Sequence, residues 1–223
     1  MINCVLIDND GVLVDTEGVF FRATRETLQT YGVEVTRDRF IEDCLRASRG
    51  VWHLLEARGF GRSEILHVRE ERDRLYLDLL GSQEIEIAGA REFLQSLCRI
   101  CRVCVVTSSK RIHFDRIHQR TGFGEFFDRV LTIEDYPECK PSPVPYLTAL
   151  AQMNSSTANA IVIEDSERGL TAAHAAGLRC IAIPYALTAG QDFSRAWMVA
   201  ANLHEALEAI SQVNAAQEAP LLD

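Results

Sequence analysis

The sequence lacks any excess of positive charge and any long hydrophobic run. Its 223 residues include 23 Lys and Arg against 32 Asp and Glu, which gives a formal net charge of −9. Nucleic acids and anionic membranes select for clustered Lys and Arg, so we expect neither as a partner. No apolar run approaches the ~20 residues that span a bilayer. The apolar N-terminus has no basic segment of the kind that opens a signal peptide, and we expect a cytoplasmic protein.

Prolines and glycines are also few, six and thirteen, and the sequence contains no internal repeat or low-complexity segment. The seven cysteines, an odd number, fit a reducing compartment better than a disulfide framework. Cys98, Cys101 and Cys104 have the three-residue spacing of a metal-binding run. Because Cys104 lies inside an apolar stretch typical of a strand, we favour a small buried hydrophobe there over a zinc or iron–sulfur ligand.

The hydrophobic pattern changes twice along the chain. Residues 3–8 are apolar and end at a turn signal, which predicts a short buried strand. Residues 17–80 show helical spacing without a strand pattern and predict an all-helical block. Strands are then expected at 102–107, 130–132, 160–164 and 179–183, and helices at 90–98, 111–120, 143–151, 168–176 and 203–210. Such alternation predicts a parallel sheet covered by helices on both faces.

The expected fold class is therefore α/β, a Rossmann-like parallel-sheet core with an inserted all-helical domain. We expect the core to comprise residues 1–15 and 87–223 and the helical domain residues 16–86. The tail from Asn214 to Asp223 is expected to be loose.

Polar side chains follow the ends of the predicted strands. Ligands of parallel α/β sheets bind beyond the carboxyl ends of the strands, so these side chains are the first candidates for a site. They are Asp8 and Asp10 after the first strand, Thr107, Ser108 and Ser109 after the second, Lys140 in the loop after the third, and Glu164 and Asp165 at the end of the fourth. We expect them to converge on one edge of the sheet.

Two carboxylates so close together have a use in phosphoryl transfer. One can attack phosphorus and form an acyl phosphate, and the other can protonate the leaving oxygen and later deprotonate water. Crowded carboxylates repel each other unless a hard cation binds, so Asp8, Glu164 and Asp165 are suitable ligands for Mg²⁺. Lys140 and the Thr107 hydroxyl can bind the phosphoryl group and offset its charge.

Each feature alone has an ordinary explanation. Asp-x-Asp-Gly is most often a turn, Thr107 an N-cap and Lys140 a solvated loop residue. Glu164-Asp165-Ser166 alone is a strand end that runs into a helix cap. Their combination, in this order and each at a strand end, is far less expected by chance.

Four ordered segments carry a resemblance to the haloacid dehalogenase-like superfamily, in its helical-cap branch of small-molecule phosphatases and β-phosphoglucomutase-like enzymes. They are Asp8-Asn9-Asp10-Gly11-Val12-Leu13-Val14-Asp15-Thr16-Glu17, the strand ending in Thr107, Lys140-Pro141-Ser142-Pro143, and Glu164-Asp165-Ser166 with Gly169 and residues 172–177. The resemblance covers residues 3–185. It implies that the inserted helices form a cap that closes over the site and selects the substrate.

The resemblance also implies roles for the candidate residues. Asp8 would be the nucleophile and Asp10 the general acid/base, while Thr107 and Lys140 would bind phosphate. We expect Ser108 to join them. Glu164, Asp165, Asp8 and the backbone carbonyl of Asp10 would serve Mg²⁺. True dehalogenases lack the second aspartate, so its presence favours phosphoryl transfer.

Three positions depart from the family pattern. Asn9 replaces an apolar or aromatic residue, Val144 replaces an aspartate, and Ala88 replaces the proline before Gly89 at the cap hinge. None of these changes removes a catalytic group.

Arg49 is the best candidate for a substrate contact in the predicted cap, because the mutases contact phosphate with an arginine in a similar Ser-Arg pair. An exposed arginine at a helix end is an equal alternative. Mutases also use a cap lysine, whereas residues 17–86 contain none.

We therefore expect a phosphoric monoester hydrolase: a magnesium-dependent phosphatase of a small phosphorylated metabolite, with a sugar or sugar-acid phosphate favoured. The alternatives are a β-phosphoglucomutase-like phosphosugar mutase and, from another class, a non-catalytic binding protein on the same fold. The family resemblance favours a monomer.

Overall fold

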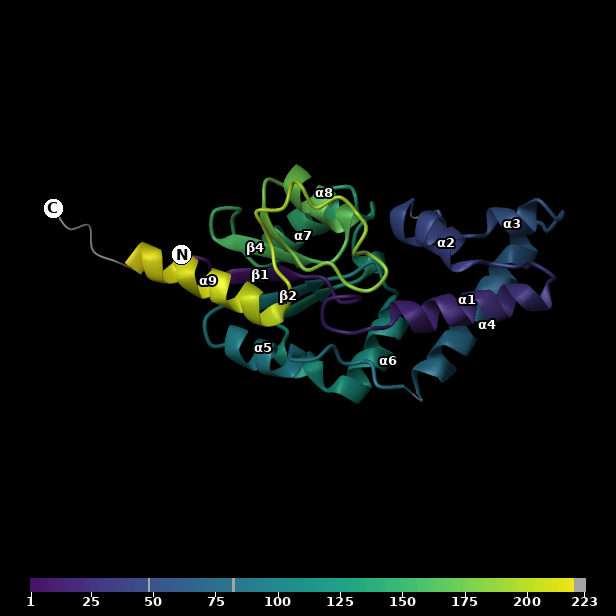
Figure 1. The fold of residues 1–223 in the computed structure, drawn as a ribbon, viewed down its shortest axis with the longest axis horizontal. Helices are drawn as coiled ribbons and strands as arrows, with labels where there is room; N and C mark the ends of the chain where they lie inside the picture. The colour runs from purple at the N-terminus through teal and green to yellow at the C-terminus, as the bar shows by residue number, and fades with distance from the viewer. Residues whose placement is uncertain (48, 82, 219–223) are drawn as a thin grey trace. The chain divides into compact units, whose positions relative to one another are not determined.

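The computed structural model describes residues 1–47, 49–81 and 83–218. The chain divides into two compact units, Met1–Val14 with Glu86–Asp223, and Asp15–Ile85. Figure 1 shows that the first unit contains a sheet with helices and that the second contains helices. The domain boundaries expected from the sequence stay a prediction.

The core is built on a six-stranded sheet in which neighbouring strands run parallel. In spatial order the strands are β3 (Arg129–Leu131), β2 (Arg102–Val106), β1 (Cys4–Ile7), β4 (Ala160–Glu164), β5 (Arg179–Ala182) and β6 (Met198–Val199). Cys4 of β1 is paired with Arg102 on one side and Ala160 on the other. The sequence does not predict β6, because two residues are too short to show a period.

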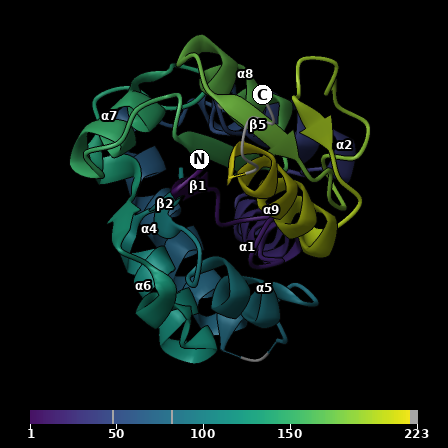
Figure 2. The same ribbon diagram turned by 90° about the vertical axis from the view of Figure 1, so that its left-hand side faces the viewer.

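Helices cover both faces of this sheet (Figures 1 and 2). One face carries α7 (Val144–Gln152) and α8 (Glu167–Ala175), which pack against each other. The other carries α5 (Ala90–Leu97), α6 (Arg111–Thr121) and α9 (Leu203–Glu218). Short 3-10 helices at Phe123–Phe126 and Ile133–Asp135 follow α6 and β3.

The position of β1 inside the sheet, between β2 and β4, explains why its sequence is continuously apolar. All four residues of β1 are fully buried. Cys4 and Leu6 belong to the core cluster that includes Tyr146 of α7, and the two-residue period of a strand turns Val5 and Ile7 to the opposite face. A sheet covered on both faces therefore selects apolar residues at every position of β1.

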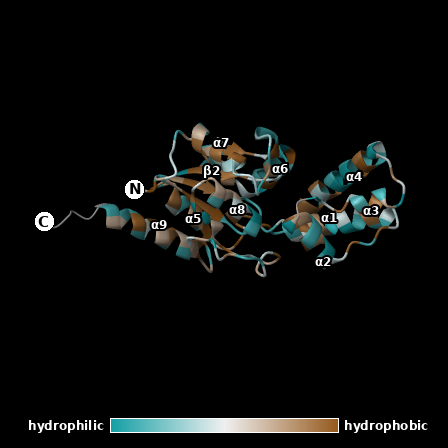
Figure 3. Ribbon diagram, turned by 90° about the horizontal axis from the view of Figure 1, so that it is seen from above, coloured by the Kyte–Doolittle hydropathy of each residue, from teal (hydrophilic) through white to brown (hydrophobic). Residues whose placement is uncertain are grey.

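Every secondary-structure element described in the second unit is a helix. Its elements are α1 (Glu17–Thr30), α2 (Arg37–Phe40), a π-helix (Ile41–Arg46), α3 (His53–Glu56) and α4 (Arg62–Leu80). The rings of Phe20 on α1 and Tyr76 on α4 meet edge to face, with centroids 5.1 Å apart. Figure 3 shows hydrophilic and hydrophobic residues alternating along α4, as expected of a helix with one buried face.

These elements confirm the predicted fold class, a Rossmann-like α/β core with an inserted all-helical unit. Within the described part of the chain, no helix combines the length and the apolar character required to cross a bilayer.

The last helix is longer than predicted. The sequence pattern ends it at Ile210 and leaves a loose tail from Asn214, but α9 continues to Glu218, and residues 219–223 lie outside the described residues. The Ile2 amide donates to Asn214 Oδ1 at 2.6 Å, and Asn214 Nδ2 donates to the Ile2 carbonyl at 2.8 Å. These long-range bonds stabilise the additional turns, and no local pattern reveals them.

The variant Asn214→Ala removes both bonds to the backbone of Ile2, which is fully buried. We expect the free energy of unfolding to fall by about 2 kcal/mol, because an unsatisfied buried donor or acceptor costs more than one net hydrogen bond contributes. Urea unfolding measures the change. Ser211→Ala is the control on the same helix, since the Ser211 hydroxyl bonds the nearby Leu207 carbonyl. An equal loss in both variants would contradict the prediction.

Candidate active site

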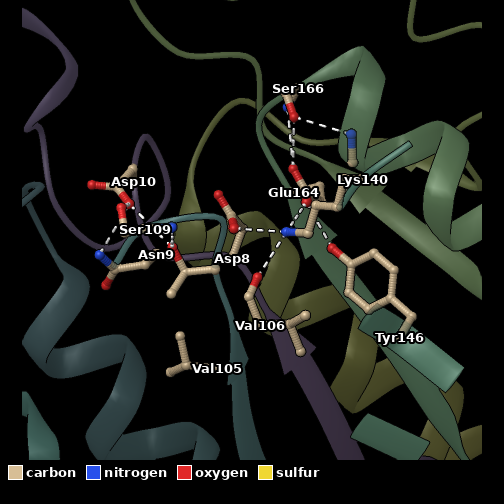
Figure 4. Close-up of polar contacts among 12 residues, drawn as sticks. Asp8, Asn9, Asp10, Val105, Val106, Ser109, Lys140, Tyr146, Glu164 and Ser166 are labelled. Carbon is tan, nitrogen blue, oxygen red and sulfur yellow. Dashed lines mark hydrogen bonds and ion pairs between the residues drawn. The ribbon is translucent and has the colours of Figure 1, made fainter. Parts of the chain in front are cut away.

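The predicted site residues of the core lie together at the carboxyl edge of the sheet. Figure 4 shows Asp8, Asp10, Lys140 and Glu164 among them. Asp8 follows β1, Thr107 follows β2, and Glu164 ends β4 with Asp165 next to it. Lys140 comes from the loop before α7. All five residues are buried. They meet because β2, β1 and β4 are neighbours in the sheet.

The ammonium group of Lys140 lies at the centre of the site. Its Nζ donates hydrogen bonds to Asp8 Oδ1 at 2.7 Å, Glu164 Oε1 at 2.6 Å and the Val106 carbonyl at 2.7 Å (Figure 4). A lysine has three donors, so these acceptors use all of them. A charge removed from water is stable only when it is paired and hydrogen-bonded, and this arrangement meets both conditions.

Burial and charge act in opposite directions on these groups. For Lys140, burial alone would lower the pKa, but Asp8 and Glu164 raise it above its usual value. For Glu164, burial favours the neutral form, yet Lys140 and the Tyr146 hydroxyl hold its pKa below the usual range. For Asp8, burial raises the pKa to about 7, and the attraction of Lys140 only partly opposes it. A further positive charge at the site would favour ionised Asp8.

Both carboxylate oxygens of Glu164 accept hydrogen bonds. Oε1 accepts from Lys140 and from the Tyr146 hydroxyl at 2.7 Å, and Oε2 accepts from the Ser166 hydroxyl at 3.0 Å. Gly169 permits this packing, because a Cβ at that position would lie 1.8 Å from Glu164 Oε1. The orientation of Glu164, and through it that of Lys140, is therefore fixed by the residues around it.

Three carboxylates are close enough to hold a cation. One oxygen each from Asp8, Glu164 and Asp165 lies within 4.8 Å of the others, and all three residues are buried. These carboxylates face one ammonium, so the donor set fits a hard divalent cation that offsets the remaining negative charge. The carboxylate of Asp10 is not in this cluster, and its predicted metal contact through the backbone carbonyl stays a prediction.

The side chain of Asp10 is directed to the end of β2. Its Oδ2 accepts hydrogen bonds from the Ser109 hydroxyl at 2.8 Å and the Thr107 hydroxyl at 3.3 Å. Thr107 Oγ1 in turn accepts from the Ser109 amide at 3.0 Å. Ser108 lies between them and is half-buried. The hydroxyls at this strand end thus orient a second carboxylate beside Asp8.

Asn9 connects this site to α6. It is fully buried, its Nδ2 donates to Asp10 Oδ2 at 3.4 Å, and its Oδ1 lies 2.8 Å from His118 Nε2. Nδ1 of the same ring lies 3.0 Å from Thr121 Oγ1. Burial lowers the pKa of His118 to about 4, with the charge of Asp10 opposing. The ring is therefore neutral near pH 7.

Arg49, the predicted substrate contact, lies in the helical unit and is exposed. Its guanidinium donates to Asp43 Oδ1 from Nε at 3.0 Å and also from Nη2. Asp43 is fully buried, and Arg39 and His53 lie 3.6 Å from its other oxygen. Ser48, which forms the predicted Ser-Arg pair with Arg49, lies outside the described residues. A role for Arg49 in binding stays a prediction.

Sequence reasoning misses three residues of the site: His118, Tyr146 and Thr188. It places Ser109 in the hydroxyl run at the end of the second strand but gives it no role, and the structure shows its bond to Asp10. The Thr188 hydroxyl donates to Asp165 Oδ2 at 3.1 Å from a loop far along the chain. In the sequence, Tyr146 and His118 look like ordinary helix residues, because their contacts depend on how those helices pack on the sheet.

Cys104 is buried in β2, as predicted. Burial raises its pKa to about 12, which keeps the thiol neutral. Cys101 is also buried, whereas Cys98 is exposed.

Gly11 lets the turn after Asp10 pass close to Asp165. Its φ is +81°, and a Cβ there would lie 2.3 Å from Asp165 Oδ2. The variant Gly11→Ala should displace that carboxylate and strain the backbone. We expect the affinity for Mg²⁺, measured by calorimetry, to fall about tenfold or more. Gly18→Ala, where a Cβ meets nothing within 4 Å, should leave the affinity unchanged, and equal affinities in the two variants would be the contrary result.

His118 makes the stability of the fold depend on pH. Its pKa is about 4 in the folded chain against an ordinary 6.5. Between these values only the unfolded chain binds the proton, so the free energy of unfolding falls as the pH drops through this window, by roughly 3 kcal/mol in total. Above the window the stabilisation is fully present. Urea midpoints from about pH 7 to 4 should fall more steeply for the native chain than for His118→Gln, and parallel curves would contradict the assignment.

Comparisons with known proteins agree with this geometry. A sequence model of the haloacid dehalogenase-like hydrolases matches residues 5–183. A phosphorylated carbohydrates phosphatase of Thermotoga maritima is 30% identical, over 88% of this chain and 92% of its own length. Protein SUPPRESSOR OF QUENCHING 1 of Arabidopsis thaliana is 31% identical over 84% of this chain, which spans only 18% of that longer protein.

Solved structures extend the comparison. A crystal structure of CbbY from Rhodobacter sphaeroides in complex with phosphate matches with a TM-score of 0.80 and 27% identity, over 92% of this chain and 96% of that one. A mutant of the same protein has been solved with xylulose-(1,5)bisphosphate. The prediction of an enzyme, a phosphoric monoester hydrolase, agrees with these relatives. The matched segment contains every site residue of the core that the sequence predicts, from Asp8 to Asp165, and the chain belongs to the haloacid dehalogenase-like hydrolase family.

Proposed function

We propose that this chain is a magnesium-dependent phosphatase of a small phosphorylated metabolite. The observation that carries the proposal is the convergence of Asp8, Glu164 and Asp165 around the buried Lys140, with Asp10 beside them. Well-packed apolar residues usually stabilise a core as well as a buried ionic cluster does. Such a cluster at the ligand-binding edge of a parallel sheet therefore favours a catalytic role.

Asp8 is the nucleophile of the proposed reaction. One of its carboxylate oxygens attacks the phosphorus of the substrate, the bond from phosphorus to the substrate oxygen breaks, and an aspartyl phosphate forms. Lys140, bonded to Asp8 Oδ1 at 2.7 Å, holds the carboxylate in a fixed orientation. Its charge also offsets the negative charge of the approaching phosphoryl group.

Asp10 is the general acid and then the general base. Its proton passes to the departing substrate oxygen, which leaves as an alcohol. Water then attacks the phosphorus of the aspartyl phosphate, gives a proton to Asp10, and releases inorganic phosphate and the Asp8 carboxylate. Thr107 and Ser109 hold Asp10 for both transfers. We assign Thr107, Ser108 and Lys140 to phosphate binding, and Lys140 acts there through its charge because its three donors are already used.

Asp8, Asp165, Glu164 and the Asp10 carbonyl would hold Mg²⁺, which when bound offsets the charge of the phosphoryl oxygens. Glu164 contributes its charge while its oxygens keep the hydrogen bonds to Lys140 and Ser166. Thr188 orients Asp165 by the bond to its Oδ2.

The proposed substrate class is a sugar phosphate or sugar-acid phosphate. The Thermotoga relative is named for phosphorylated carbohydrates, and CbbY has been solved with a sugar bisphosphate. Arg49, exposed and anchored on the buried Asp43, is the proposed contact for a further anionic group of the substrate. The seven cysteines are all free, which supports action in the reducing cytoplasm. We propose that the chain acts there as a monomer.

Phosphate release from a panel of phosphorylated metabolites tests this proposal, first with Mg²⁺ and then with EDTA. We expect magnesium-dependent release from a narrow set of sugar phosphates. The variant Asp8→Asn should lose at least ~1,000-fold in kcat, because it removes the nucleophile. The control is Asp115→Asn, the same substitution at an exposed position on α6, which should keep the native rate.

Full turnover by Asp8→Asn with Mg²⁺ present would exclude the aspartyl phosphate. If the folded protein released no phosphate from the panel, the phosphatase would be excluded. A coupled assay with a bisphosphate activator then tests the mutase, which releases little free phosphate. The lack of lysine in residues 17–86 disfavours that alternative. Failure of both assays would leave the non-catalytic binding protein.

A further inference from the structure

Position 9 carries a fully buried amide between two aspartates. The two-residue period of β1 explains where this side chain goes. Asp8 points to the face covered by α7 and meets Lys140, whereas Asn9 points to the opposite face and meets His118 on α6. The series of hydrogen bonds that starts at Asn9 therefore runs on the face of the sheet opposite to the one where Asp8 meets Lys140.

The hydrogen-bonding groups from Asn9 to Thr121 fit one direction. Asn9 Oδ1 can only accept, so His118 Nε2 carries the proton and donates to it at 2.8 Å. Nδ1 of the neutral ring is then an acceptor, and the Thr121 hydroxyl donates to it at 3.0 Å while its oxygen accepts from the Phe123 amide at 3.2 Å. Asn9 Nδ2 is left to donate to Asp10 Oδ2 at 3.4 Å. Every link is satisfied when the histidine is neutral.

The surroundings of His118 favour that neutral state. Its ring lies 4.2 Å from the ring of Phe114, 6.0 Å from that of Phe123 and 5.3 Å from that of Phe127, measured between centroids. The residue as a whole is only 7% exposed. An apolar enclosure fixes the orientation of the imidazole and disfavours its charged form, so the same donor faces Asn9 throughout the neutral pH range.

We propose that Asn9 and His118 are positioning residues that orient the carboxylate of Asp10 for proton transfer. This inference rests on the proposed function, in which Asp10 is the general acid/base. His118 fixes the Asn9 amide, and the Asn9 amide adds a third donor to Asp10 Oδ2 beside the hydroxyls of Thr107 and Ser109.

The three donors approach Asp10 from different elements. Thr107 and Ser109 come from the end of β2, while Asn9 is supported by α6. With Oδ2 fixed from both directions, the plane of the carboxylate and the position of Oδ1 are also fixed. A general acid depends on such geometry, because proton transfer requires the acid to lie within hydrogen-bond reach of the leaving oxygen.

The leaving group of the substrate distinguishes positioning from a purely structural role. An alkyl phosphate needs a proton on its departing oxygen, whereas p-nitrophenyl phosphate releases a stable anion and needs little help. The ratio of kcat/KM for the two substrates reports how well the general acid works in forming the aspartyl phosphate. Lost packing would lower both values together.

The test uses Asn9→Leu, His118→Leu and the double variant, with the full-length protein and Mg²⁺. We expect each single variant to lose about 10-fold or more in kcat/KM for the alkyl phosphate. For p-nitrophenyl phosphate we expect less than about 3-fold loss. The double variant removes both polar partners, so its urea midpoint should recover relative to the single variants. The ratio of kcat/KM for the alkyl phosphate to that for p-nitrophenyl phosphate should stay low in the double variant.

Asp10→Asn supplies the reference. It should itself lower the alkyl-to-aryl ratio, and in that background Asn9→Leu and His118→Leu should have no further effect on the ratio, because they act through Asp10. His113→Leu is the matched control, a buried histidine on the same helix, and it should leave the ratio at the native value.

The outcomes separate the two proposals. If Asp10→Asn does not change the ratio, Asp10 is not the general acid, and both the proposed mechanism and this inference are overturned. If Asp10→Asn lowers the ratio but Asn9→Leu and His118→Leu do not, only this inference is overturned. If the double variant regains the native ratio together with its stability, the Asn9–His118 pair is structural and the inference is likewise overturned.

Discussion

An ammonium group removed from water needs three acceptors, and Lys140 finds one at the end of each of three neighbouring strands. Asp8 follows β1, the Val106 carbonyl ends β2, and Glu164 ends β4. Because the three acceptors must surround a single nitrogen, the lysine fixes where the strands end relative to one another. The positions of the carboxylates, the close packing of Gly169 and the orientation of Tyr146 all follow from this requirement.

The charges of the helical unit have a comparable structural role. The guanidinium carbon of Arg72 lies 4.2 Å from the ring centroid of Phe20 and 5.2 Å from that of Trp52. Two nitrogens of the Arg49 guanidinium donate hydrogen bonds to the buried Asp43. Both arrangements use the flat guanidinium, which a lysine cannot reproduce. At positions 49 and 72, arginine therefore has a structural role that a lysine could not fill.

The sequence predicts the strands and the residues at their ends because both signals are local. An apolar run identifies β1, and the polar residues directly after it identify the candidate site. Asn214, Tyr146, His118 and Thr188 could not be found in this way, since each acquires its role from a partner far away in the chain. The last turns of α9 were missed for the same reason, because they depend on the bonds between Asn214 and Ile2. The two residues of β6 are too few to show a pattern, and only their pairing with β5 identifies the strand.

The place of β1 in the sheet has a consequence for synthesis on the ribosome. This strand precedes both of its partners in the chain, residues 102–106 and 160–164, yet it lies between them in the sheet. The helical unit, Asp15–Ile85, is completed before either partner exists. The growing chain must therefore carry β1 as an unpaired apolar strand until residues 102–106 have emerged, and Asp8 acquires its ion pair only after Lys140 has left the exit tunnel.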